Sequence, residues 1–331
     1  MESFKDVVGH QDIIQYIQDT IKNDNLSHAY ILNGAKGSGK RLLAGLFAMT
    51  LQCESAKANG EACKKCPSCK KALSGNHPDV ITLTHESLNS ISVDEVRKQV
   101  VSDIQIKPYY GPYKIYVIPN ADLLTTQAQN AILKTLEEPP QYAVILLLTR
   151  NADSLLETIR SRCVILKLRN IRDTVVKKYL LEQFDIPEAK ADICVAFAQG
   201  NVGQAMKLAN NQDFDELREE VIHFLTNVDN MELPQVYEAV KRSTQYKLTI
   251  IDYLDLISIW YRDVLIYKAT KNPNKVIFAD QLSHIKERTV KSSYEGIERV
   301  LTSLEKSKAR IRANVNFELT IELLFLTIKE N

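Results

Sequence analysis

Strand-like and helix-like patterns of hydrophobic residues alternate along the first half of the chain. Short apolar runs, typical of buried strands, are separated by stretches whose apolar residues recur every three or four positions, as on one helix face. The apolar runs cover residues 29–32, 80–83, 113–118, 143–148 and 164–168. The helical stretches cover residues 10–22, 42–51, 92–101, 128–138 and 155–159. This alternation predicts a doubly wound α/β domain with a parallel sheet over residues 1–168.

The pattern changes after residue 168, because only helical periodicity continues. Residues 169–211 are predicted to form a small helical lid domain. Residues 212–331 contain longer amphipathic helices and are predicted to form a separate all-helical domain. Apolar stripes on such helices are most often core, but they fit an oligomerisation collar equally well.

A glycine-rich loop follows the first predicted strand and precedes a helix. Residues 34–40 read Gly-Ala-Lys-Gly-Ser-Gly-Lys, and this spacing aims backbone N–H groups and a lysine ammonium at a polyphosphate. The next position should be Ser or Thr, whose hydroxyl holds Mg²⁺, but it is Arg41. The candidate phosphate-binding residues are Gly34, Gly37, Ser38, Gly39 and Lys40.

The acidic groups that ATP hydrolysis needs are missing after the strand at 113–118. Hydrolytic enzymes with such a loop carry an acidic pair there, one residue holding Mg²⁺ and the other polarising the attacking water. Pro119 and Asn120 occupy these positions, and Asp122 lies too far along to be taken as a substitute. Because the loop keeps its phosphate contacts, ATP or ADP binding fits the sequence, whereas hydrolysis is not expected.

Four of the six cysteines cluster in an insert between residues 53 and 69. In a reducing cytosol such clustering indicates a metal site rather than disulfides. Two C-x-x-C steps sharing one cysteine, plus a cysteine at the end of the preceding helix, can close a tetrahedral Zn²⁺ site. A redox pair would leave two cysteines unexplained, and His77 is better interpreted as a loop histidine because four sulfurs complete the shell. The predicted ligands are Cys53, Cys63, Cys66 and Cys69.

Composition narrows the class of protein. The 331 residues include 42 basic and 41 acidic side chains, a net charge of +1, which argues against a nucleic-acid binder driven by overall charge. The first residues show no signal-peptide pattern, and no stretch reaches the roughly 18 apolar residues of a membrane span. We therefore expect a cytoplasmic protein without a membrane partner.

The order of several short motifs resembles that of the delta-prime subunits of the bacterial DNA polymerase III clamp loader, over nearly the whole chain. After the glycine-rich loop and the cysteine insert come HPDV at 77–80, ISVDEVR at 91–97, NAILKTLEEPP at 130–140 and IRSRC at 159–163. In the last third, WYRDVL at 260–265 and NFELTIELL at 316–324 also look like this family.

This resemblance implies an AAA+ core, a helical lid and a C-terminal collar through which five subunits form a ring. It implies gamma/tau and delta subunits as partners, with the sliding clamp and primer-template DNA reached through the complex. It also implies a poor or absent ATPase that supplies the arginine of its S-R-C motif, here Arg162, to a neighbouring site. Such a trans-acting cation raises the rate by roughly 10³ to 10⁵ in comparable NTPases. Residues 200–205 carry no arginine where active relatives place a second phosphate sensor.

Two other functions are compatible with parts of the pattern. An active motor ATPase, such as a gamma/tau-like subunit or a Holliday-junction AAA+ protein, would turn over ATP alone with Mg²⁺, but Pro119 and Asn120 argue against it. A zinc-dependent nucleic-acid module is suggested by the lysines beside the cysteines, although solvated lysines near a zinc knuckle are common.

Overall fold

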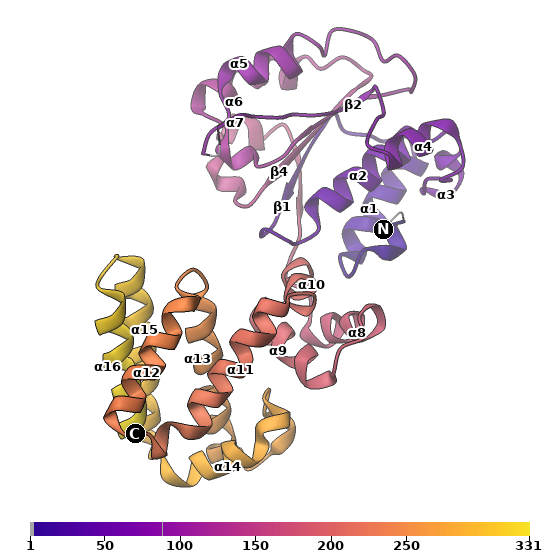
Figure 1. The fold of residues 1–331 in the computed structure, drawn as a ribbon. Coiled ribbons are helices and arrows are strands. Elements are labelled where there is room, and N and C mark those ends of the chain that lie inside the picture. Colours follow the sequence, from indigo (N-terminus) through magenta and orange to yellow (C-terminus); the bar gives the residue numbers. More distant parts are fainter. Residues whose placement is uncertain (1–2, 88) are drawn as a thin grey trace. The chain divides into compact units, whose positions relative to one another are not determined.

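The computed structural model describes residues 3–87 and 89–331 and contains a parallel five-stranded sheet (Figure 1). The order of the strands in space is β2-β3-β4-β1-β5. Because β1 pairs in parallel with β4, and β4 with β3, the carboxyl ends of these three strands lie on the same side of the domain. In chain order the strands are β1 (Ala29–Asn33), β2 (Val80–Thr82), β3 (Lys114–Ile118), β4 (Ala143–Thr149) and β5 (Val164–Lys167).

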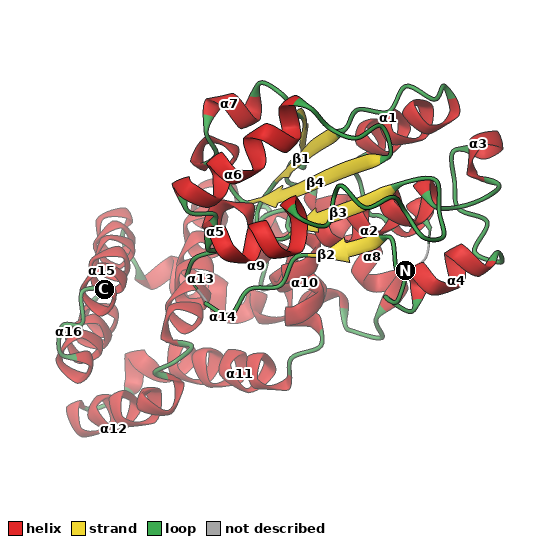
Figure 2. Ribbon diagram, turned by 90° about the horizontal axis from the view of Figure 1, so that it is seen from above, coloured by secondary structure: helices red, strands yellow, loops and turns green. Residues whose placement is uncertain are grey.

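Helices cover both faces of the sheet (Figure 2). Tyr30 and Leu32 of β1 point to one face and Ala29 and Ile31 to the other, so both sets are buried and the strand reads as a continuous apolar run. The first face is covered by α1 (Gln11–Lys22), α2 (Lys40–Leu51), α3 (Ala56–Asn59) and α4 (Pro67–Leu73). The second is covered by α5 (Val93–Val96), a π-helical turn (Arg97–Val101), α6 (Thr126–Glu137) and α7 (Glu157–Arg160).

The chain forms two compact units. The first contains the sheet, runs to Val176 and includes Gly200–Gly203, whereas the second comprises Lys177–Gln199 and Gln204–Asn331. The later helices are α8 (Asp173–Gln183), α9 (Glu188–Ala198), α10 (Val202–Ala209), α11 (Gln212–Asn227), α12 (Leu233–Ser243), α13 (Ile250–Thr270), α14 (Leu282–Lys291), α15 (Tyr294–Arg312) and α16 (Phe317–Glu330). Short 3₁₀ turns lie at Phe4–Asp6, Ala121–Leu123, Ala152–Ser154, Val228–Asn230, Thr244–Tyr246, Pro273–Lys275 and Ala279–Gln281.

The core of the second unit is built around α13, whose Tyr253, Trp260 and Tyr261 are fully buried. Buried Arg288 of α14 donates hydrogen bonds to the Tyr261 hydroxyl and to the Ile328 carbonyl, both at 2.7 Å. These contacts tie α13, α14 and α16 together, so the C-terminal helix is part of the folded core.

The fold class predicted from the sequence, an α/β P-loop AAA+ core with a parallel sheet followed by helices alone, is confirmed. The helical stretch predicted over residues 92–101 begins with a capping box formed by Ser92 and Glu95, and it becomes a π-helical turn after Val96. The division of the chain at 168/169 and 211/212 stays a prediction. Within the described residues, no helix combines the length and the apolar character needed to cross a membrane.

Candidate functional site

The glycine-rich loop, called the phosphate loop below (residues 34–40), connects the end of β1 to the start of α2. Gly37 and Gly39 have φ values of +90° and +91°, a left-handed conformation that side chains other than glycine rarely adopt. The Gly34 N–H donates to the Thr149 carbonyl at 3.1 Å, which anchors the loop to β4. The Lys40 ammonium donates to the carbonyls of Gly34 and Ala35 and so closes the loop on itself.

Residues 200–203, called the backing segment below, pack directly against the phosphate loop. The Asn201 side-chain amide donates to the Lys36 carbonyl at 2.6 Å, and the Gly203 N–H donates to the Gly37 carbonyl at 3.1 Å. A Cβ atom at Gly203 would lie 2.5 Å from the Gly37 carbonyl oxygen. A glycine is therefore required at this position, and its contacts hold the loop in one conformation.

Arg41 occupies the position where a metal-binding hydroxyl is expected, and it lies beside a cavity of mixed polar and apolar lining. Arg41 and Pro119 both line this cavity, which measures about 520 Å³. Its other walls come mainly from α2, α4, β2 and β3. Asn120 adopts the left-handed conformation with φ at 53° and begins a 3₁₀ turn.

Asp122 lies in that turn and is engaged by Arg150, which follows β4. Its carboxylate accepts hydrogen bonds from the Arg150 backbone N–H at 3.1 Å and from Nε at 2.9 Å, and it forms an ion pair with Nη2 at 2.8 Å. Burial raises the pKa of Asp122, but these hydrogen bonds outweigh burial and lower it below its ordinary value. Sequence analysis did not pair these two residues. The signal that could have found them is that both follow the carboxyl ends of strands.

Lys40 lies within electrostatic reach of this pair. Burial lowers the pKa of Lys40; the charge of Asp122 raises it, and that of Arg150 lowers it further. The net direction is downward. Together with Arg41, which follows Lys40 directly, these residues place three cationic side chains and one ion-paired carboxylate near the phosphate loop.

Arg162 lies beside the amino end of strand β5, whereas the phosphate loop follows the carboxyl end of strand β1. It follows α7 and precedes β5, whose Val164 is in register with Tyr30. Gly34 is four residues beyond Tyr30, so at least about 13 Å of strand separates the two sites along the sheet. Arg162 is therefore placed outside its own phosphate loop.

The Arg162 guanidinium is partly exposed and contacts Thr158, Ser161 and Glu137. It donates to the Thr158 carbonyl at 3.0 Å and forms an ion pair with Glu137 at 3.0 Å, where the two side chains are 37% and 50% exposed. The adjacent Cys163 is a poor thiolate because burial raises its pKa to about 12. Of the S-R-C motif, only the arginine therefore offers a charged group at the surface of the protein.

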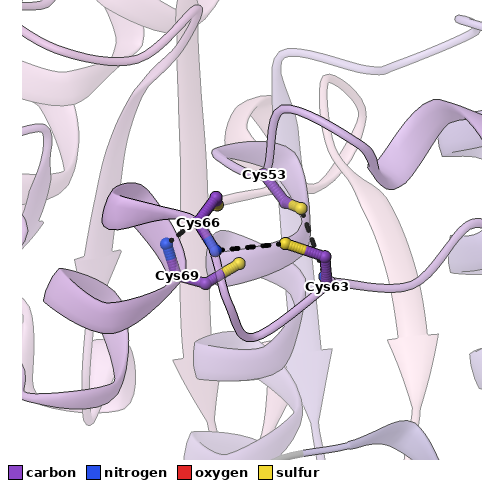
Figure 3. Close-up of side chains that lie close together, drawn as sticks. All are labelled: Cys53, Cys63, Cys66 and Cys69. Atoms are coloured by element: carbon purple, nitrogen blue, oxygen red, sulfur yellow. Dashed lines mark hydrogen bonds between the residues drawn. The ribbon is translucent and has the colours of Figure 1, made fainter.

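The four clustered cysteines come together after α2 (Figure 3). Their sulfur atoms all lie within 4.8 Å of one another, close to the sulfur–sulfur spacing of about 3.8 Å in a tetrahedral Zn²⁺ site. The six cysteines of the chain are free thiols. Four close cysteines in this arrangement could bind a metal such as zinc.

Backbone N–H groups of the insert point at these sulfurs, as Figure 3 shows. The N–H of Cys63 donates to Cys53 at 3.2 Å, and those of Cys66 and Cys69 donate to Cys63 and Cys66 at 3.4 Å. Backbone hydrogen bonds from Cys66 and Lys65 lower the pKa of Cys63 to about 6, whereas burial raises the pKa values of Cys53 and Cys69.

His77 is buried beside the insert, and both of its ring nitrogens have partners within the protein. One nitrogen contacts the Ser68 hydroxyl at 2.9 Å and the other accepts the Asp79 N–H at 3.1 Å. Its place in the fold therefore agrees with the interpretation of a loop histidine rather than a fifth metal ligand.

Comparisons with known proteins cover nearly the whole chain. Two family models match, "DNA polymerase III, delta subunit" over residues 9–172 and "DNA polymerase III, delta subunit, C terminal" over residues 212–330. The DNA polymerase III subunit delta' of Bacillus subtilis is 30% identical over 96% of this chain and 95% of its own length. The subunit tau of the same species is 28% identical over 92% of this chain and 53% of its own length.

A solved structure, a DNA polymerase III gamma subunit-related protein from Thermotoga maritima, also resembles the chain. It is 18% identical, covers 95% of this chain and 99% of its own length, and superposes with a TM-score of 0.46.

Proposed function

This chain belongs to the family of delta' subunits of bacterial DNA polymerase III, and we propose that it is a hydrolysis-deficient component of the clamp loader. In this role it helps to load the sliding clamp onto primed DNA and supplies Arg162 to the ATP site of a neighbouring subunit. The proposed role is cytoplasmic and involves no membrane.

The observation that carries the arginine role is the location of Arg162. Its side chain is partly exposed and lies at the amino ends of the strands, away from its own phosphate loop at the carboxyl ends. Its charge is therefore available to a phosphate held by another subunit. Its planar guanidinium has five N–H donors, and Thr158, Ser161 and Glu137 engage only its two terminal nitrogens. A cation placed in trans stabilises the charge that develops on the transferring phosphoryl group.

The proposed loss of hydrolysis is supported by three separate features of the sequence. Arg41 replaces the metal-binding hydroxyl, and Pro119 with Asn120 replaces the acidic pair. Residues 200–205 contain no arginine, although active relatives place a second phosphate sensor there. The phosphate loop itself is intact, so we propose that ATP or ADP binds there without turnover, through Gly34, Gly37, Ser38, Gly39 and Lys40.

The partners we propose are the gamma/tau and delta subunits in a pentameric ring, with the clamp and primer-template DNA reached through the complex. The presence of tau and gamma subunits among the relatives supports this assignment. Exposed apolar side chains on α12 and α16, which pack against each other, offer a surface for collar contacts. They are Leu233, Tyr237, Leu319 and Leu323.

We also propose one structural Zn²⁺ per chain, held by Cys53, Cys63, Cys66 and Cys69. The close approach of the four sulfurs and the N–H groups directed at them support this site, because such bonds favour the thiolate form. When bound, the ion would cross-link the insert between α2 and α4 and supply no catalytic chemistry.

The test of the arginine role is the DNA-stimulated ATPase of the reconstituted loader with wild-type chain or Arg162→Ala. We expect the variant to assemble normally and to lower the ATPase, with Arg160→Ala as the matched control, because Arg160 is a neighbouring, partly exposed arginine that pairs with Asp153. Full ATPase in the Arg162→Ala complex would refute the role. Mg²⁺-dependent turnover by the isolated chain would instead favour an active motor subunit.

A further inference from the structure

The residues around the phosphate loop do not fit the Mg²⁺ ion that hydrolytic P-loop proteins hold with their nucleotide. Mg²⁺ takes oxygen ligands in a near-octahedral arrangement, commonly carboxylates, hydroxyls, phosphates and water. The corresponding positions here carry the cation Arg41, the apolar ring of Pro119 and the neutral amide of Asn120.

Asp122 does not supply the missing ligand. One carboxylate oxygen accepts the Arg150 backbone N–H at 3.1 Å and lies 3.4 Å from the Thr149 hydroxyl. The other accepts the Arg150 guanidinium at 2.9 and 2.8 Å. The side chain is only 10% exposed, and its negative charge is paired. A metal would have to displace Arg150 to reach this carboxylate and would break the ion pair that compensates its burial.

Arginine side chains instead provide positive charge on this side of the loop. Arg150 is 53% exposed despite its contact with Asp122. Its charge also lowers the pKa of the nearby Lys40 ammonium, although burial lowers that pKa more. Arg41 follows Lys40 directly at the start of α2 and lines the cavity beside Pro119. Guanidinium groups bind phosphate oxygens through paired, charge-assisted hydrogen bonds and need no metal to do so.

We propose that this phosphate loop binds the polyphosphate of a nucleotide without Mg²⁺, with Arg150 and Arg41 making the cationic contacts that a metal makes in hydrolytic relatives. The inference rests on the proposed retention of nucleotide binding. It assigns a function to Arg150, and it makes the free nucleotide anion, rather than its magnesium complex, the preferred ligand.

The test is isothermal titration of the full chain with ATP, once in EDTA and once in millimolar Mg²⁺. We expect affinities in EDTA to equal or exceed those in Mg²⁺, whereas a metal-dependent site would lose at least about tenfold in EDTA, equivalent to about 1.4 kcal/mol. ADP is titrated in the same way to separate the contribution of the terminal phosphate.

The variant that isolates the arginine is Arg150→Gln, because glutamine keeps an N–H donor for Asp122 while it removes the charge. We expect its ATP affinity in EDTA to fall by roughly 10- to 100-fold, the usual effect of losing a hydrogen bond between charged groups. Arg97→Gln is the matched control. Arg97 is exposed on the π-helical turn that covers the second face of the sheet, and its replacement changes the net charge by the same amount. Circular dichroism verifies that both variants are folded, and Arg150→Lys, which keeps the charge, should retain most of the affinity.

The possible results distinguish metal-independent binding from the retention of nucleotide binding itself. Binding that requires Mg²⁺, or Arg150→Gln binding as tightly as wild type, overturns metal independence and leaves nucleotide retention standing. No ATP binding in either buffer refutes retention and the inference together. None of these results changes the role proposed for Arg162, which is measured in the assembled loader.

Discussion

Substitution of Gly203 by alanine tests whether the backing segment holds the phosphate loop in its conformation. The added Cβ would lie 2.5 Å from the Gly37 carbonyl oxygen and 3.0 Å from its Cα. Both are backbone atoms that cannot rotate away, so either the loop or the start of α10 must shift. The hydrogen bond from the Gly203 N–H to the Gly37 carbonyl would then be lost.

The expected cost follows from these two effects. Forcing a methyl group into a packed site costs about 1–3 kcal/mol, and a lost backbone hydrogen bond costs about 0.5–1.5 kcal/mol. We therefore expect the unfolding free energy of the sheet-containing unit to fall by about 2–4 kcal/mol. Because the loop would lose a fixed conformation, ATP affinity should fall as well.

The assay combines urea denaturation followed by circular dichroism with hydrogen exchange of the peptide that covers the phosphate loop. Tryptophan fluorescence reports the other unit, since the single tryptophan, Trp260, lies in α13. Gly45→Ala is the matched control. A Cβ there meets nothing within 4 Å, and alanine in a helix interior should stabilise the chain by up to about 1 kcal/mol. If Gly203→Ala leaves both stability and loop exchange as in wild type, the reasoning about the backing segment is wrong.

Three further results are expected. Cys69→Ser should lower the zinc content of chain purified without chelator from near one ion per molecule, as measured by elemental analysis, and a wild-type protein without zinc would contradict the metal site. The unfolding free energy should decrease between pH 7 and pH 5, because burial lowers the pKa values of His10 and His77 in the folded chain. Below about pH 6.5 the unfolded chain therefore binds more protons than the folded chain. Urea midpoints that do not change with pH would disprove this. Arg162→Ala and Glu137→Gln should each change the unfolding free energy by less than about 1 kcal/mol, because their ion pair is exposed; a larger loss in urea denaturation would mean that the pair is structural.

The strands and the phosphate loop could be predicted from the sequence because their signals are local. An apolar run between polar turns specifies a strand buried on both faces, and the glycine spacing specifies the positive φ values found at Gly37 and Gly39. The cysteine spacing likewise indicated which sulfurs lie together. The proposed function of each of these residues stays a prediction.

The contacts that sequence analysis missed depend on tertiary structure. Asp122 meets Arg150 because β3 and β4 are neighbours in the sheet and both residues follow carboxyl ends. Asn201 reaches the Lys36 carbonyl across 165 positions of the chain. No periodicity encodes such pairs, since the partner of a polar side chain is decided by which strands and turns become adjacent. The absence of an arginine at 200–205 was visible, but the close packing of Gly203 that accompanies it was not.

The two roles proposed for this chain depend on residues at opposite ends of the strands. Arg162 takes its contacts from Thr158 and Glu137, on the helices of the second sheet face. None of these contacts involves Arg41, so the proposed loss of hydrolysis and the proposed role of Arg162 depend on separate surroundings. The phosphate loop also has a structural reason to keep its glycines, because Asn201 and Gly203 pack against Lys36 and Gly37. The phosphate loop thus has a packing role in this structure, separate from the nucleotide binding proposed above.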